Sequence, residues 1–270
     1  MDWARIMVPL SGGAADTAIA QAGLVLARAF EAELALVHAP ADVADLMPWI
    51  GDGFMGGVQA SAIDSIRDAA AAGQAAARTS GNQLGYDKTT FVSLSSPVWS
   101  NLAMEGRLSD VVIFDGPTAR GKGPLAEAFQ QVVADEQRPT IVVRSEIQPT
   151  GVVAVAWDGG KEASRAMRTS IPLLQRASEV VVLSVAGATS RKFDPGRLVA
   201  FLQSRNVRAR AQPVAGQSDV GALLLGAARA AGAYLLVAGA FGHPRLQEYV
   251  FGGTTRSLLH AEGPSLFLSH

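Results

Sequence analysis

Two stretches of this chain, residues 5–13 (RIMVPLSGG) and residues 152–160 (VVAVAWDGG), carry the same pattern of a short apolar run that ends in two glycines. Each run has the length and apolar content of a buried strand, and the glycines mark the turn after it. A helical pattern follows in both places. Strand, turn and helix in this order are typical of a βαβ unit, so the chain predicts two copies of one small α/β unit.

The rest of the chain repeats the same order of elements. We expect strands at residues 5–10, 34–38, 89–94, 111–114 and 140–143, and again at 152–157, 180–185, 207–214, 234–238 and 265–268. Helical patterns separate them, among them residues 60–84, 125–135 and a helix that runs to about Gln175. This predicts two tandem five-stranded parallel-sheet domains with helices on both faces, that is, a doubly wound α/β fold. The short linker at 146–150 divides the chain into residues 1–147 and 148–270.

Composition narrows the class of protein. The chain has 270 residues, a formal net charge of -1 and no cysteine. Disulfides and thiolate metal sites are therefore excluded, and there is no basic excess for a nucleic-acid partner. The N-terminus lacks a signal-peptide pattern, and no apolar run is long enough to span a membrane. We expect a cytoplasmic protein without membrane or nucleic-acid partners.

The second copy carries a glycine loop that suits a phosphate. Gly239 and Gly242 follow an apolar strand, and nine residues later Gly252 and Gly253 open a helix. Glycine permits close approach of a ligand to the backbone, and a helix N-terminus offers unpaired N–H groups and a positive dipole end. Hydroxyls of the next two threonines can add donors or cap the helix. At the carboxyl end of a parallel strand, this arrangement predicts a phosphate site.

The spacing Gly-x2-Gly-x9-Gly resembles the ATP-binding loop of the universal stress proteins, and the duplication resembles their tandem members across nearly the whole chain. The resemblance implies strand order 3-2-1-4-5, with nucleotide across the carboxyl ends of the strands. It places Asp158 near the ribose and adenine, and the backbone of Val185 at the adenine edge. The implied phosphate-binding residues are Gly239, Gly242, Gly252, Gly253 and Thr254, with Thr255 close by.

Several of these residues also suit a purely structural role or depart from the family's pattern. Gly253 stands where the family has Ser or Thr, which removes a hydroxyl but keeps the backbone N–H. Asp158 alone suits a helix cap equally well. His243 and His260 flank the loop, and lone histidines near turns are usually exposed or capping, so neither is assigned a catalytic role.

The first copy predicts a degenerate partner. Ser11 replaces the aspartate, and Asp115 stands in the place of Gly239, which puts a carboxylate where a phosphate would lie. The stretch from Gly116 to Lys122 resembles a Walker loop, but Gly123 replaces the magnesium-binding hydroxyl and a proline follows. Residues 11–17 resemble the pyrophosphate loop of ATP pyrophosphatases, with the aspartate misplaced by one residue. Residues 45–57 have no counterpart in the second copy; their glycines and Pro48 argue against a regular element, and they suit a lid, a subunit contact or local packing.

These observations favour a nucleotide-binding protein (ATP, AMP or ADP, with or without Mg²⁺) with a regulatory role in stress adaptation. No Ser-His-Asp pattern or zinc-type spacing indicates an enzyme, so slow ATP hydrolysis is the most we expect. A nucleotide-free interaction module and an ATP-using enzyme of the pyrophosphatase type are the alternatives. The family resemblance implies that the last strands of the two copies, residues 140–143 and 265–268, lie side by side. Because bare apolar edges aggregate, we expect these strands to pair antiparallel within one chain. A further homodimer and an unidentified regulatory protein complete the expected partners.

Overall fold

The computed structural model describes residues 2–40, 56–187, 193–216, 219–240 and 253–270, with backbone only at 56–62. The strands of the first half are β1 (Arg5–Leu10), β2 (Glu33–His38), β3 (Thr89–Ser93), β4 (Val111–Asp115) and β5 (Thr140–Val143). Those of the second half are β6 (Val152–Ala156), β7 (Glu179–Val185), β8 (Ala209–Val214), β9 (Ala233–Gly239) and β10 (Ser265–Ser269).

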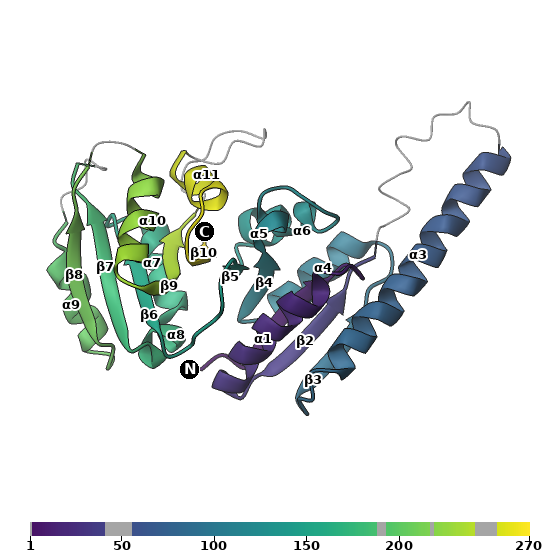
Figure 1. The fold of residues 1–270 in the computed structure, drawn as a ribbon, viewed down its shortest axis with the longest axis horizontal. Coiled ribbons are helices and arrows are strands. Elements are labelled where there is room, and N and C mark those ends of the chain that lie inside the picture. Colours follow the sequence, from purple (N-terminus) through teal and green to yellow (C-terminus); the bar gives the residue numbers. More distant parts are fainter. Residues whose placement is uncertain (1, 41–55, 188–192, 217–218, 241–252) are drawn as a thin grey trace.

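Within the described residues, all these strands form one ten-stranded sheet in the order β3-β2-β1-β4-β5-β10-β9-β6-β7-β8. Every pairing inside a half is parallel. The order 3-2-1-4-5 therefore occurs in each half, which confirms the doubly wound fold expected from the sequence. In Figure 1 the halves lie side by side, with β3 and β8 at the outer edges.

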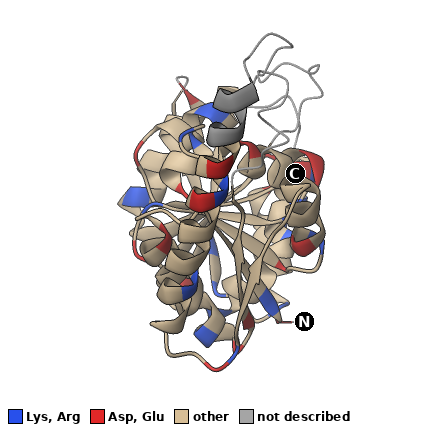
Figure 2. Ribbon diagram, turned by 90° about the vertical axis from the view of Figure 1, so that its right-hand side faces the viewer, with Lys and Arg blue, Asp and Glu red and all other residues tan. Residues whose placement is uncertain are grey.

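Helices cover both faces of this sheet (Figures 1 and 2). The first half contributes α1 (Asp16–Phe30), α3 (Gly56–Asn82), α4 (Val98–Arg107), α5 (Gly116–Ala119), α6 (Ala126–Gln130) and the π-helical turn η2 (Gln131–Asp135). The second half contributes α7 (Lys161–Thr169), α8 (Ile171–Arg176), α9 (Pro195–Gln203), α10 (Val220–Ala230) and α11 (Gly253–His260). One apolar cluster lies under α1, α7, α8 and α9, and a second lies under α4, α6, α10 and α11. Each cluster contains side chains from both halves, so the cores are continuous across the molecule.

The helices differ from the expected elements in three places. The helix expected to run to Gln175 breaks at Ser170 into α7 and α8, because a proline occupies the first turn of α8. The helix expected at 125–135 finishes as the π-helical turn η2. Gly56 and Gly57, which the sequence placed in an irregular segment, begin the long helix α3; residues 45–55 of that segment lie outside the described residues.

The seam between the halves is the antiparallel pair β5 and β10, which confirms the predicted contact between the last strands. Ile141 pairs with Phe267, and both are fully buried. The neighbouring pairings place Ile141 beside Ile113 and Phe267 beside Val237, which are equivalent positions of the two copies. The seam therefore has a local two-fold symmetry centred on Ile141 and Phe267. Because each last strand covers the edge of the other, neither leaves its backbone groups unpaired.

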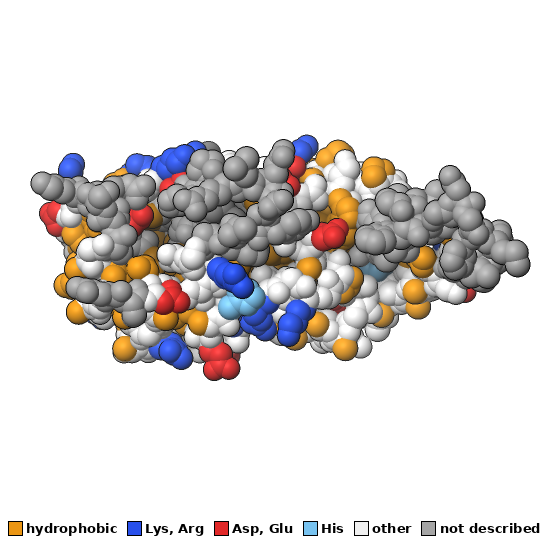
Figure 3. All heavy atoms as spheres, turned by 90° about the horizontal axis from the view of Figure 1, so that it is seen from above, with side chains coloured by type: hydrophobic (Ala, Val, Ile, Leu, Met, Phe, Trp, Pro, Cys, Tyr) orange, Lys and Arg blue, Asp and Glu red, His pale blue; other side chains and the backbone are white. Residues whose placement is uncertain are grey.

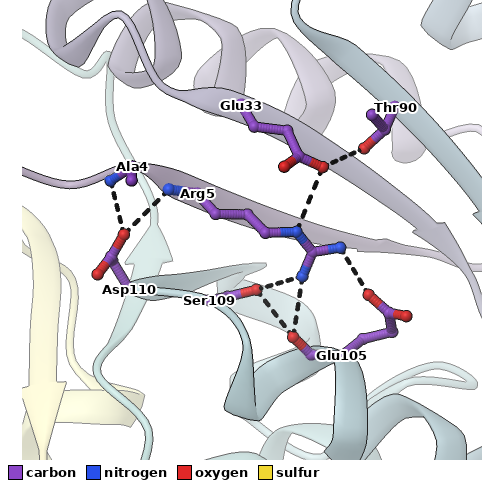
Figure 4. Close-up of polar contacts among 7 residues, drawn as sticks. All are labelled: Ala4, Arg5, Glu33, Thr90, Glu105, Ser109 and Asp110. Atoms are coloured by element: carbon purple, nitrogen blue, oxygen red, sulfur yellow. Dashed lines mark hydrogen bonds and ion pairs between the residues drawn. The ribbon is translucent and has the colours of Figure 1, made fainter.

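The amino edge of the first half is tied together by Arg5 (Figure 4). Its guanidinium donates to the Glu105 carboxylate at 2.6 Å, to the Ser109 hydroxyl at 2.9 Å and to Glu33 at 3.3 Å. Asp110 accepts from the backbone N–H of Arg5 at 3.0 Å. These contacts join the starts of β1, β2 and β4 with the end of α4, and they leave the carboxyl edge as the end where loops are free to differ.

Candidate functional site

The turn after β6 is one wall of the candidate site. Gly159 has φ +71°, a conformation that glycine adopts without strain, and Asp158 accepts a hydrogen bond from the Gly160 N–H at 2.8 Å. The Asp158 carboxylate therefore holds the turn before α7 at the carboxyl edge, but it does not cap the helix, whose N-cap is Gly160 without a side-chain cap bond. Val185 ends the neighbouring strand β7 and is buried.

Gly239 ends β9 at the same edge, and its lack of a side chain has a packing reason. A Cβ atom on Gly239 would lie 2.5 Å from the backbone nitrogen of Ala163 and 2.5 Å from the carbonyl carbon of Glu162. Helix α7 therefore approaches the end of β9 more closely than any other residue would allow. This requirement exists without a ligand, so Gly239 alone does not distinguish a phosphate site from tight packing.

The start of α11 forms the other wall. Gly253 and Thr254 are exposed, whereas Thr255 is buried. Among the described residues, none has an atom within 4 Å of a Cβ placed on Gly253. Gly242 and Gly252, the other two glycines of the predicted loop, lie outside the described residues, as does His243. His260 is exposed at the opposite end of α11.

Helix α11 is held in place by α10. Asp219 caps α10 by accepting from the Gly221 N–H at 2.9 Å, and it also accepts a hydrogen bond from the Ser257 hydroxyl. The Ser257 bond is the main reason why the pKa of Asp219 lies below its usual value. Gly221 lets the two helices touch, since a Cβ there would lie 2.7 Å from that of Ser257. The sequence analysis did not select Asp219, although an aspartate before an apolar helical run is a recognisable cap signal.

The other end of α11 is held by Arg144, which follows β5 in the first half. Its guanidinium donates to the carbonyl oxygens of Leu258 at 2.6 Å, Leu259 at 3.0 Å and Ala261 at 3.0 Å. Burial lowers the pKa of Arg144 to about 10, and the neighbouring Arg120 charge adds to this effect, so the side chain stays charged at neutral pH. No sequence signal connects these distant segments.

The corresponding turn of the first half is closed. Gly12 has a positive φ of +84°, as the equivalent Gly159 has a positive φ in its own turn. A Cβ on Gly12, however, would lie 2.3 Å from the Gly73 Cα of α3. The Asp16 carboxylate accepts from the N–H groups of Ser11 at 3.1 Å and Gly12 at 2.7 Å. A helix and an internal carboxylate thus occupy the space and use the donors that a ligand would need.

His38 ends β2 beneath this closure. Its imidazole is buried, and Nδ1 lies 3.0 Å from the Ser93 hydroxyl. Among the described residues Nε2 has no hydrogen-bond partner, and a Cβ on Gly73 would lie 3.2 Å from it. Burial lowers the pKa of His38, and the nearby Asp16 charge partly offsets that effect.

The Walker-like stretch is a short helix followed by a turn, not one continuous loop. Asp115 caps α5 by accepting from the Thr118 N–H at 2.6 Å, with Pro117 in the first helical turn. The carboxylate expected to repel a phosphate therefore serves its own helix.

Viewed from above, Lys, Arg and His side chains gather near the middle of the molecule, with acidic side chains scattered around them (Figure 3).

Two classes of site receive no support from the described part of the chain. No group of three or more His, Asp or Glu side chains there is placed to hold a metal ion. None of the helices described is long and apolar enough to cross a membrane.

Comparison with known proteins identifies the fold. No family model matches the chain, and no curated protein matches its sequence. A universal stress protein from Archaeoglobus fulgidus DSM 4304 has a TM-score of 0.63 at 13% identity, covering 98% of this chain and 95% of that one. A chain from Pseudomonas aeruginosa UCBPP-PA14, assigned to the universal stress proteins, gives 0.54 at 14% identity and covers 99% and 93%. A functionally unknown protein from P. aeruginosa PAO1 gives 0.53 at 13% identity, with 99% and 92% covered. The chain has the fold of the tandem universal stress proteins.

Proposed function

We propose that the second half binds an adenine nucleotide and that the protein acts as a nucleotide-responsive regulator of stress adaptation in the cytoplasm. The observation that carries this proposal is the exposed start of α11 at the carboxyl edge of the second half, set against the covered glycine turn of the first half. At the first edge α3 and Asp16 cover the glycine turn, whereas at the second edge Gly253 is exposed at the start of α11 and no described atom lies within 4 Å of a Cβ placed on it.

The chemistry of this edge suits a phosphate chain. The first N–H groups of a helix have no partner inside the helix, and the dipole makes that end positive. Gly253 contributes such a group without a side chain in the way, and Thr254 adds an exposed hydroxyl. Asp158 and Val185 lie at the same edge for the ribose and base. Mg²⁺, where present, would be bound by the phosphate oxygens of the nucleotide.

The proposal is tested at Gly253, because a Cβ there would lie within 4 Å of no described atom of the protein. Gly253→Asp places a carboxylate beside the phosphates, and like-charge repulsion should weaken ATP binding by about 100-fold or more. Gly253→Asn has nearly the same size without the charge and should retain most of the affinity. Isothermal titration measures both, and circular dichroism checks the fold.

Mass spectrometry of denatured, freshly purified protein provides an independent reading. Released ATP, ADP or AMP supports the proposal. If the wild-type chain neither carries nor titrates with any adenine nucleotide, the proposal is wrong.

A nucleotide-free interaction module is the second candidate, and Gly239 is the observation that favours it. The close approach of α7 accounts for this glycine without any ligand. An empty protein that still forms a stable complex with a regulatory partner would support the module. The homodimer and the partner protein remain predictions; sedimentation analysis tests the first directly.

A further inference from the structure

We propose that Arg144 of the first half is a positioning residue for the phosphate end of the second half's nucleotide site. This inference rests on the proposed function and assigns part of that site to the degenerate half. The contact behind it is the guanidinium of Arg144 on the last carbonyl groups of α11, the helix whose first residue is Gly253.

The contact restrains α11 in several directions at once. The last carbonyl groups of a helix have no partner inside the helix, and Arg144 supplies donors to three of them. A guanidinium is planar and rigid, so its N–H groups fix both distance and orientation. A positive charge at this end also matches the helix dipole. The backbone N–H of Arg144 donates to the Ser265 hydroxyl at 3.0 Å, which anchors the arginine itself to β10.

The two-fold symmetry of the seam shows that this contact is specific to one half. Arg144 lies three residues after Ile141, as His270 lies three residues after Phe267, so the two are equivalent positions. His270 Nδ1 lies 3.0 Å from the Gln137 side-chain nitrogen, just beyond η2. A cavity of about 450 Å³ adjoins that contact, lined in part by Arg138 and Arg165. Arg144 thus reaches the helix that begins at the carboxyl edge of the second half, whereas the Gln137 side chain near His270 lies beyond η2.

A shift at one end of α11 reaches the other end. Leu258 is five residues from Gly253, a distance of about 8 Å along a helix axis. Over so short a length the helix moves as one body, which α10 also holds through the Asp219–Ser257 hydrogen bond and the packing of Gly221 close to the Thr254 carbonyl. Losing the Arg144 contact should therefore loosen the N–H groups that face the phosphates, while Asp158 and Val185 on β6 and β7 keep their places.

The test compares ATP with adenosine. Arg144→Met removes the guanidinium but keeps an apolar stem, and Arg144→Lys keeps the charge without the fork. Arg138→Met, on the other side of the seam, is the matched control because Arg138 does not contact α11. We expect Arg144→Met to weaken ATP by about tenfold, the size of effect of losing a charged hydrogen-bonded group. Adenosine, which lacks phosphates, should bind unchanged, and Arg138→Met should alter neither.

Amide hydrogen exchange of residues 253–260 in the nucleotide-free protein provides the second readout, and it should accelerate in Arg144→Met only. Equal weakening of ATP and adenosine would indicate general destabilisation and overturn the positioning role. Unchanged ATP affinity in Arg144→Met would overturn it too. If Arg144→Met does not fold, Arg144→Lys replaces it in the test. A lower ratio of ATP to adenosine affinity than in the wild type supports the positioning role, and an unchanged ratio overturns it. Absence of nucleotide binding by the wild-type chain would instead overturn the proposed function, and with it this use of α11.

Discussion

The two halves share a strand order and a glycine turn, yet their carboxyl edges are opposites. Gly12 and Gly159 occupy equivalent turns with nearly the same φ, +84° and +71°. In the first half Asp16 accepts the N–H groups of that turn, and Gly73 lies against it. In the second half the nearest covering atoms belong to Phe193, at 3.2 Å or more from a Cβ on Gly159. The fold thus survives when its binding edge is closed, because the sheet and not the edge carries the core.

The closure is chemically complete at the turn. Buried polar groups are normally hydrogen-bonded, and a carboxylate is a strong acceptor for backbone N–H groups. Asp16 meets this need from within the chain. At the equivalent turn of the second half, Asp158 accepts the N–H group of Gly160. The first N–H groups of α11 receive no acceptor from any side chain that the structure describes.

The largest expected effect comes from breaking the seam that joins the halves. Phe267 is fully buried, and its ring stacks on Trp3 of the first half at 6.1 Å. Phe267→Ala should lower the free energy of unfolding by about 3–5 kcal/mol, and Ile141→Ala by about 2–5 kcal/mol. Since the cores are continuous, tryptophan fluorescence and far-UV circular dichroism should report one coincident transition. Two separate transitions in the wild type would mean that the halves are independent units.

The next largest effect is a difference in stability between substitutions at the amino edges of the two halves. Arg5 is largely buried and holds Glu105 and Ser109, whereas the equivalent residue of the second half is Val152. Arg5→Met should lower the free energy of unfolding by about 2 kcal/mol, because it leaves polar groups unpaired. Arg210→Met breaks an exposed pair with Glu179 and should cost at most about 0.5 kcal/mol. Urea unfolding measures both; equal losses would contradict the role of the Arg5 network.

A smaller effect depends on pH and belongs to the closed edge. The pKa of His38 is lowered in the folded state by burial, so the unfolded chain binds its proton more readily. The stability that neutral His38 provides is complete above the unfolded pKa of about 6.5, and it is lost as the pH falls below that value. The loss cannot exceed about 1.4 kcal/mol per unit of pKa lowering.

The variant His38→Gln should flatten the dependence of the unfolding free energy between pH 7.5 and pH 5. Proton NMR titration of the four histidines should show one imidazole with a pKa below the others. A normal pKa for His38 would mean that the imidazole is accessible to solvent and that α3 does not cover it tightly.

The last prediction is a substitution that leaves the ATP affinity unchanged. Lys122 is exposed in the turn after α5, in a half whose edge is closed. Lys122→Ala should leave ATP affinity unchanged within the error of titration. A loss of binding in this variant together with normal binding in Gly253→Asp would show that the first half holds the nucleotide.

The repeat was predictable because its signals are local. Apolar runs, the Ser11 and Asp158 turns and the order of elements all lie in short windows, and the strand order followed from a resemblance on those windows. The cap of α5 was not predicted: Asp115 was interpreted only as a carboxylate in a phosphate position, although it precedes Gly-Pro and the first turn of a helix favours that proline. The helix itself was missed because α5 has only four residues, too few for a helical pattern of apolar residues to be detected.

The parts that escaped prediction are contacts between distant segments. Nothing near Gly73 indicates that it packs on Gly12, and nothing near Arg144 indicates three carbonyl acceptors more than a hundred residues away. Gly239 shows the converse problem. A glycine required by an adjacent helix and a glycine required by a phosphate look identical in a sequence, and only the packing of α7 reveals the first requirement.

The joining of the two copies in one polypeptide chain also changes how they can diverge. In a symmetric homodimer every substitution occurs twice, so closing one binding edge closes both. Here the partner across β5 and β10 is encoded separately, and a substitution such as Ser11 for an aspartate affects one edge only. Tethering also makes the pairing intramolecular, so it does not depend on protein concentration. A cell that holds few copies of this chain therefore still has the paired form, with one edge free to specialise while the other serves as its support.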